Sequence, residues 1–108
     1  MSDSINIQHL DGVCRIEIAR EEKKNALTAA MYQTMADALA SAEADPAVKV
    51  ILICGAGGNF TAGNDLTDFL QNPPMDETAP VFRFINGFAN LQKPFVAAVE
   101  GVAIGVGT

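Results

Sequence analysis

The sequence is short of several residue types, and each shortage argues against a class of function. Its 108 residues include one histidine and two cysteines. Cys14 and Cys54 lie in separate apolar runs without a CxxC pair, so we expect buried free thiols and no metal site. Seven basic residues stand against 13 acidic ones, and the net charge of −6 opposes binding to nucleic acid or anionic lipid. We therefore expect neither nucleic acid nor a membrane as a partner.

Long apolar runs are also missing. No stretch approaches the roughly 20 apolar residues of a membrane span, and the first residues lack the basic-then-apolar pattern of a secretory signal. Apolar residues nevertheless make up 49% of the chain and charged residues 19%, so a globular core can form. The length suits one domain, 1–108. We expect a protein of the reducing cytoplasm, with an organelle as the alternative.

Strand and helix signals alternate along the chain, which indicates an α/β arrangement. Residues 5–10 and 13–19 flank Asp11-Gly12, a dipeptide that favours a two-residue hairpin turn. Asp45-Pro46 ends the next segment, a predicted helix that Thr28 can cap. The apolar stripe of that helix is formed by Leu27, Met31, Met35, Leu39 and Ala42.

The second half of the chain continues this alternation. Residues 49–54 form an apolar run that predicts a central strand covered on both faces. Asp65 can cap a short helix that begins at Leu66, and the prolines and acids of 72–77 predict a loop. A helical stripe follows, and 95–99 reads as a further strand. The stripe consists of Val81, Phe82, Ile85, Phe88 and Ala89.

Two glycine-containing segments, 55–66 and 101–108, each follow a predicted strand. In both, the chain passes from a glycine turn into a helix start, where backbone N–H groups lack helical partners and attract negative charge. Two such ends can converge on one anion. The alternative is that the glycines only form turns. A nucleotide-binding loop is excluded, because Phe60 breaks the GxGxxG pattern and no phosphate-loop lysine follows.

Three ordered motifs identify a family resemblance over nearly the whole chain. They are Asn25-Ala26-Leu27, then Phe60-Thr61-Ala62-Gly63-Asn64-Asp65-Leu66, then Lys93-Pro94-Phe95-Val96-Ala97-Ala98-Val99-Glu100-Gly101 with Gly105-Val106-Gly107. Together they resemble the crotonase superfamily of enoyl-CoA hydratases and isomerases. The resemblance implies an α/β, crotonase-like (ClpP/crotonase) fold, of which this chain is an N-terminal part with a β-hairpin, a mixed sheet and flanking helices.

The resemblance also implies a chemistry and a site. Family members bind an acyl-CoA thioester and stabilise the negative charge on its oxygen with two backbone N–H donors, which map onto Asn64 and Val106, whose side chains are free to vary. Coenzyme A is part of the substrate, so no separate cofactor is expected. A homo-oligomer, a trimer or hexamer in the family, is expected. The remaining substrate-binding positions are Ala62, Gly63, Asp65, Leu66, Gly105 and Lys24.

Lys24 is assigned because coenzyme A is anionic and the chain is acidic. Arg20, Lys23 and Lys24 cluster just before the first helix, near where the family receives the nucleotide end of coenzyme A. The alternative, held equal, is a solvated charged turn.

The catalytic acids of the family are the missing part of the pattern. They lie beyond the second glycine segment, and of the acids present Asp65 reads as a helix cap, Asp68 as first-turn charge and Glu100 as a strand-end residue. We therefore expect the 108-residue chain by itself to be nearly inert. Gly63-Asn64-Asp65-Leu66 favours the Δ3,Δ2-enoyl-CoA isomerase branch slightly. Two alternatives stay open: a non-catalytic acyl-CoA-binding or assembly module, and a purely structural α/β domain.

Overall fold

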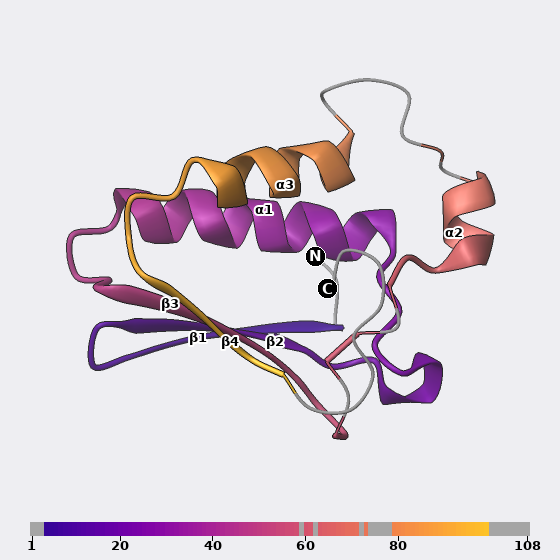
Figure 1. Ribbon diagram of the computed structural model, residues 1–108, viewed down its shortest axis with the longest axis horizontal. Coiled ribbons are helices and arrows are strands. Elements are labelled where there is room, and N and C mark those ends of the chain that lie inside the picture. The colour runs from indigo at the N-terminus through magenta and orange to yellow at the C-terminus, as the bar shows by residue number, and fades with distance from the viewer. Residues whose placement is uncertain (1–3, 59, 62, 72, 74–78, 100–108) are drawn as a thin grey trace.

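A four-stranded sheet with helices on one face organises the computed structural model, which describes residues 4–58, 60–61, 63–71, 73 and 79–99. Figure 1 shows α1 and α3 side by side above the sheet and α2 apart from them at one end. The elements are β1 (Ile5–Leu10), β2 (Val13–Ile18), the 3-10 turn η1 (Glu21–Lys23), α1 (Ala29–Ala44), β3 (Val50–Gly55), α2 (Leu66–Gln71), α3 (Pro80–Ala89) and β4 (Phe95–Ala98).

The sheet is mixed and its strands follow chain order, β1-β2-β3-β4. β1 and β2 form the predicted antiparallel hairpin, and Asp11 and Gly12 take positive φ angles of 53° and 83° at its turn. β3 pairs in parallel with both β2 and β4, so β3 is an interior strand, as the sequence predicts. The carboxyl ends of β2, β3 and β4 therefore lie at one edge of the sheet, and the segments after them start there.

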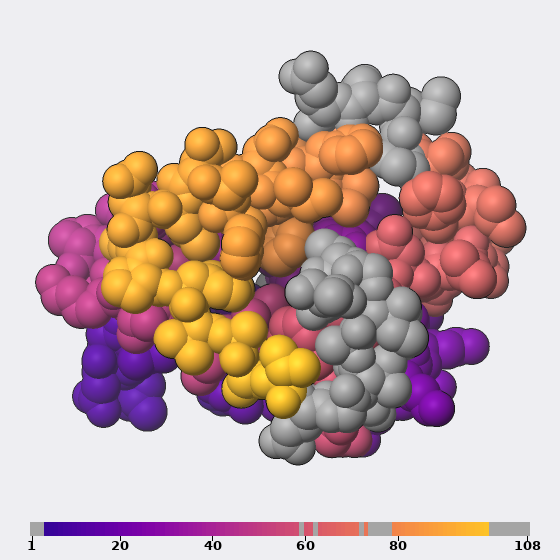
Figure 2. All heavy atoms as spheres, viewed as in Figure 1, coloured from indigo at the N-terminus to yellow at the C-terminus, as the bar shows by residue number. Residues whose placement is uncertain are grey.

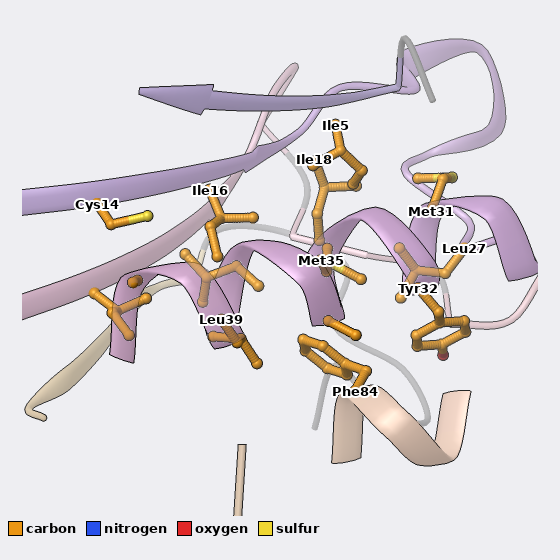
Figure 3. Packing of buried hydrophobic residues seen from close by; sticks show 14 of the residues in the cluster. Ile5, Cys14, Ile16, Ile18, Leu27, Met31, Tyr32, Met35, Leu39 and Phe84 are labelled. Atoms are coloured by element: carbon orange, nitrogen blue, oxygen red, sulfur yellow. The ribbon is translucent and has the colours of Figure 1, made fainter. Parts of the chain in front are cut away.

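The core lies between α1 and the sheet (Figure 3). Thr28 caps α1 as predicted, accepting a hydrogen bond from the Met31 amide at 3.2 Å. The sheet presents alternate residues of each strand because side chains of a strand point to opposite faces. The predicted stripe of α1 is fully buried against Ile5, Cys14, Ile16, Ile18, Ile51 and Ile53.

Two details of this packing differ from the sequence-based prediction. On β3 only Ile51 and Ile53 are buried, whereas Leu52 on the opposite face is half-buried. On α3 the buried residue is Phe84, which lies outside the predicted stripe, because α3 packs along α1 and turns that side toward it. The predicted loop at 72 and 74–77, and the predicted helix start after Gly101, lie outside the described residues.

Candidate active site

Two segments that follow neighbouring strands lie side by side at the sheet edge. Residues 25–28 follow β2 and residues 63–65 come after β3, and they meet in an isolated parallel bridge between Leu27 and Asn64. The Leu27 amide donates to the Gly63 carbonyl oxygen at 2.7 Å, and the Asp65 amide donates to the Leu27 carbonyl oxygen at 2.8 Å. The bridge fixes the main chain on both sides of Asn64.

The bridge also decides where the Asn64 amide points. The Gly63 carbonyl and the Asn64 N–H belong to one planar trans peptide unit, in which the two groups point in opposite directions. Since the carbonyl is bound to Leu27, the Asn64 N–H faces away from residues 25–28. No described residue accepts a hydrogen bond from it. A fixed N–H that no described residue binds can bind an oxyanion.

Gly63 is held on its other side by a threonine. The buried Thr61 hydroxyl accepts a hydrogen bond from the Gly63 amide at 3.1 Å and donates one to the Asn25 carbonyl oxygen at 2.6 Å. Gly63 itself has a φ of 88°, a conformation that glycine adopts readily and residues with a Cβ do not. The residue type at 63 is therefore set by the backbone.

Asn25 fixes the neighbouring segment from inside the protein. It is fully buried and has a φ of 61°. Its side-chain oxygen accepts from the Arg20 amide at 2.8 Å, and its side-chain nitrogen donates to the Ala56 carbonyl oxygen at 2.9 Å. Asn25-Ala26-Leu27, the first of the three family motifs, lies just before the Thr28 cap of α1, and its Leu27 pairs with Asn64.

The two aspartates near Asn64 have structural roles. Asp65 caps α2 as predicted, accepting from the Asp68 amide at 2.9 Å, and its other oxygen lies 2.7 Å from the Arg20 guanidinium. The Asp68 amide, followed by the Arg20 guanidinium, holds the pKa of the Asp65 carboxyl below its ordinary value. Asp68 accepts from the Ala29 amide at 2.7 Å and so caps α1. Both carboxylates are used to join α2, α1 and the segment after β2.

The three predicted coenzyme A ligands differ in their surroundings. The Arg20 side chain is only 19% exposed and is bound to Asp65, whereas Lys23 and Lys24 are exposed. A cavity of about 520 Å³ beside Asn64 is lined by Arg20 and Lys23, but Lys24 does not line it. The assignment of Lys24 to substrate binding stays a prediction. The cavity lining is Arg20, Lys23, Ala26, Thr28, Asn64, Asp65, Leu66, Thr67, Asp68 and Gln71.

A second cavity, of about 300 Å³, has a largely apolar lining. Leu27 and Thr61 border it, and α3 and β4 contribute Phe84, Phe88 and Phe95. Figure 2 shows the surface hollowed between α3 and β4. An apolar space therefore adjoins the residues that hold the 63–64 peptide.

Tyr32 also contacts this site, which no pattern in the sequence had indicated. Its hydroxyl donates a hydrogen bond to the Asn64 side-chain oxygen, and the residue is only 3% exposed. The Asn64 side chain, predicted to be free to vary, thus has a partner. Tyr32 directly follows Met31 but is not part of the apolar stripe of α1. The only hint of its role in the sequence is a tyrosine beside that stripe.

The structure describes part of the predicted site. Gly63, Asn64, Asp65 and Leu66 lie in the segment between β3 and the first turn of α2, and their role in substrate binding stays a prediction. Ala62, Gly105 and Val106 lie outside the described residues. Within the described ranges no group of histidine, cysteine, aspartate or glutamate side chains has a metal-binding arrangement, and no helix is long and apolar enough to cross a membrane.

Comparisons with known proteins show the family of this chain. A family model described as enoyl-CoA hydratase/isomerase matches residues 8–108. Enoyl-CoA delta isomerase 2 of Rattus norvegicus is 39% identical, covering 97% of this chain and 28% of its own length. Enoyl-CoA hydratase ACTT3 of Alternaria alternata is 36% identical, covering 90% and 34%. The structure of Pseudomonas aeruginosa OdaA superposes with a TM-score of 0.92 at 47% identity, covering 98% of this chain and 43% of that one. This chain therefore spans less than half the length of these relatives.

Proposed function

The chain belongs to the enoyl-CoA hydratase/isomerase family, and on that premise we propose that the protein acts on acyl-CoA thioesters by stabilising an enolate oxygen. Its fold is the N-terminal part of the crotonase fold, a mixed sheet with a β-hairpin and helices. Residues 1–108 are accordingly proposed as the N-terminal part of an acyl-CoA-binding domain.

One observation carries this proposal: the N–H of Asn64 is fixed by the bridge to Leu27 and faces away from residues 25–28. Removing an α-proton from a thioester, or adding water to its conjugated double bond, places negative charge on the thioester oxygen. A donor that is already oriented stabilises that charge without reorganising during the reaction, and one such donor is worth about 3 kcal/mol of barrier. The second donor is proposed to be the Val106 amide, with Ala62 and Gly105 beside the substrate.

The surroundings of the amide suit the two ends of an acyl-CoA molecule. We assign the anionic nucleotide end to the exposed Lys23 and Lys24, near the cavity that Asn64 lines, because cationic side chains attract phosphate. The apolar cavity beside Thr61 offers a surface for the acyl chain.

The reaction is proposed to be the Δ3,Δ2-isomerisation of an enoyl-CoA, on two grounds. The Gly63-Asn64-Asp65-Leu66 motif favours that branch, and the rat relative carries the name of a delta isomerase. Asp65 and Asp68 are occupied as helix caps, so neither is assigned as the catalytic base. The 108-residue chain alone is proposed to bind thioesters but to turn them over very slowly, since general acid–base catalysis supplies roughly 100- to 10,000-fold.

The proposed setting is a homo-oligomer in a reducing compartment, the cytoplasm. Two free cysteines in the described chain fit a reducing compartment. Several large apolar side chains are exposed, among them Leu66 at 76% and Leu70 at 80%, and such surface is commonly covered by another subunit.

Calorimetric titration with two thioesters tests the proposal. Acetoacetyl-CoA ionises to an enolate and butyryl-CoA does not, so a preformed oxyanion site binds the first more tightly, by about 10-fold or more. Equal affinity for both would contradict the oxyanion assignment and leave a non-catalytic acyl-CoA-binding module. If the chain binds neither thioester, the remaining alternative is a purely structural α/β domain.

A further inference from the structure

The hydroxyl of Tyr32 is a polar group at the junction of three elements. The ring lies between α1 and α3, where its centroid is 5.8 Å from that of Phe84 (Figure 3). The residue is 3% exposed, and its hydroxyl donates to the side-chain oxygen of Asn64. A contact across 32 residues of sequence thus joins the first helix to the candidate oxyanion segment.

Packing alone does not explain a tyrosine at this position. A phenylalanine would fill the space beside Phe84 without burying a hydroxyl, and a buried hydroxyl costs free energy unless it is paired. The partner it finds is the exposed Asn64, whose side chain would otherwise sample several rotamers. The bond therefore orders a side chain that packing leaves free.

The main-chain hydrogen bonds beside Asn64 do not hold its side chain, which is held by the contact with Tyr32. Leu27 holds the Gly63 carbonyl and the Asp65 amide, both on one side of the segment. The Asn64 side chain is held from α1 instead, by Tyr32. Attachment at both main chain and side chain restricts rotation of the 63–64 peptide unit, whose N–H must stay about 3 Å from the oxyanion.

We propose that Tyr32 is a positioning residue of the oxyanion site, which aims the Asn64 amide by holding the Asn64 side chain. The inference rests on the proposed function, because it deepens the role of the Asn64 N–H. On this proposal, the Tyr32 hydroxyl strengthens binding of an enolate but does not affect binding of a neutral thioester.

The variant Tyr32→Phe tests this directly, because it removes the hydroxyl and keeps the ring beside Phe84. Calorimetric titration of the 108-residue chain gives the ratio of the affinities for acetoacetyl-CoA and butyryl-CoA. We expect Tyr32→Phe to lower that ratio about 3- to 10-fold, the range of one net hydrogen bond, with the butyryl-CoA affinity unchanged. Ser41→Ala, which removes a hydroxyl from the exposed side of the same helix, should leave the ratio unchanged.

A double-mutant cycle with Asn64→Ala separates positioning from a general loss of stability. If the two side chains act through one bond, Tyr32→Phe/Asn64→Ala lowers the ratio no further than either single variant. Additive losses would overturn the proposal, as would an unchanged ratio in Tyr32→Phe. Equal losses of both affinities would also overturn it, since they indicate a purely structural role.

Failure of the proposed function has a different signature. If the wild-type chain shows no preference for acetoacetyl-CoA, the oxyanion assignment and the role of Tyr32 are both wrong. If the wild-type chain has the preference and Tyr32→Phe keeps it in full, only the role of Tyr32 is wrong.

Discussion

The Leu27 amide donates to the Gly63 carbonyl oxygen at 2.7 Å, and through the planar peptide unit this bond turns the Asn64 N–H away from residues 25–28. The residue that aims the donor is therefore 37 positions earlier in the chain, in the segment after the neighbouring parallel strand. Such an arrangement needs both segments to start at the same sheet edge, which parallel pairing ensures.

Substitution at Gly63 should damage the site more than substitution at Asn64. Gly63 has a φ of 88°, so Gly63→Val strains the backbone and moves the 63–64 peptide. We expect loss of most of the preference for acetoacetyl-CoA, about 100-fold if the donor is lost, against about 3- to 10-fold for Asn64→Ala. Calorimetric titration measures both, with thermal melting as the folding control. A larger loss in Asn64→Ala than in Gly63→Val would show that the Asn64 side chain is the functional group.

Asn25→Ala should destabilise the protein strongly for its size. It removes the hydrogen bonds to the Arg20 amide and the Ala56 carbonyl inside the protein and places alanine at a φ of 61°. We expect a loss of about 2 to 4 kcal/mol in the free energy of unfolding, measured in urea. Asn86→Ala, at an exposed position of α3, is the matched control and should cost under about 0.5 kcal/mol. Similar losses for the two variants would contradict the role of Asn25.

Acid should weaken the link between Asp65 and Arg20. The folded-state pKa of Asp65 is lowered, first by the Asp68 amide and then by Arg20, so its contribution to stability is present at neutral pH and lost as the pH falls below about 4. In Asp65→Asn the free energy of unfolding should therefore fall less steeply between about pH 5 and pH 2. Urea unfolding at each pH measures it. An unchanged slope in Asp65→Asn would show that this carboxyl does not carry the effect.

Alkali should act on the tyrosine. Burial raises the pKa of Tyr32 to about 12, above the value near 10 of an exposed tyrosine. The folded protein thus retains the Tyr32 hydroxyl proton to a higher pH than the unfolded chain does. The free energy of unfolding therefore falls as the pH rises from about 10 to 12. Tyr32 is the only tyrosine in the chain, so tyrosinate absorbance reports it alone. Native protein at pH 11 should show little tyrosinate until urea is added; full ionisation without urea would place Tyr32 in solvent.

Self-association should depend on α2. Leu70 is 80% exposed, and Leu66 and Phe69 of the same helix are exposed beside it, so Leu70→Glu should lower the mean mass found by light scattering. Leu10→Glu is the matched control, because Leu10 is 73% exposed at the hairpin and has no such apolar neighbours on its element. Association that is equally sensitive to both changes would indicate non-specific hydrophobic contact.

Much of the site followed from local sequence. Asp11-Gly12 set the hairpin turn, Thr28 and Asp65 capped α1 and α2, and the spacing of the α1 stripe identified its sheet-facing side. Each of these depends on φ preferences or on bonds within four residues, which neighbouring residues decide by themselves. The motif around Gly63 and Asn64 likewise lies where the sequence predicted.

The tertiary structure decided the contacts between distant segments. Sequence periodicity showed that α1 has an apolar stripe, but only the packing of α3 along α1 buried Tyr32 and Phe84. The partners of Asn64, Leu27 and Tyr32, are 37 and 32 positions away, and nothing in a local pattern selects such a pairing. The sequence by itself determined which backbone conformations and helix starts are possible, because these are local. The direction of the Asn64 amide arose only when parallel strands brought two separate segments to one edge of the sheet.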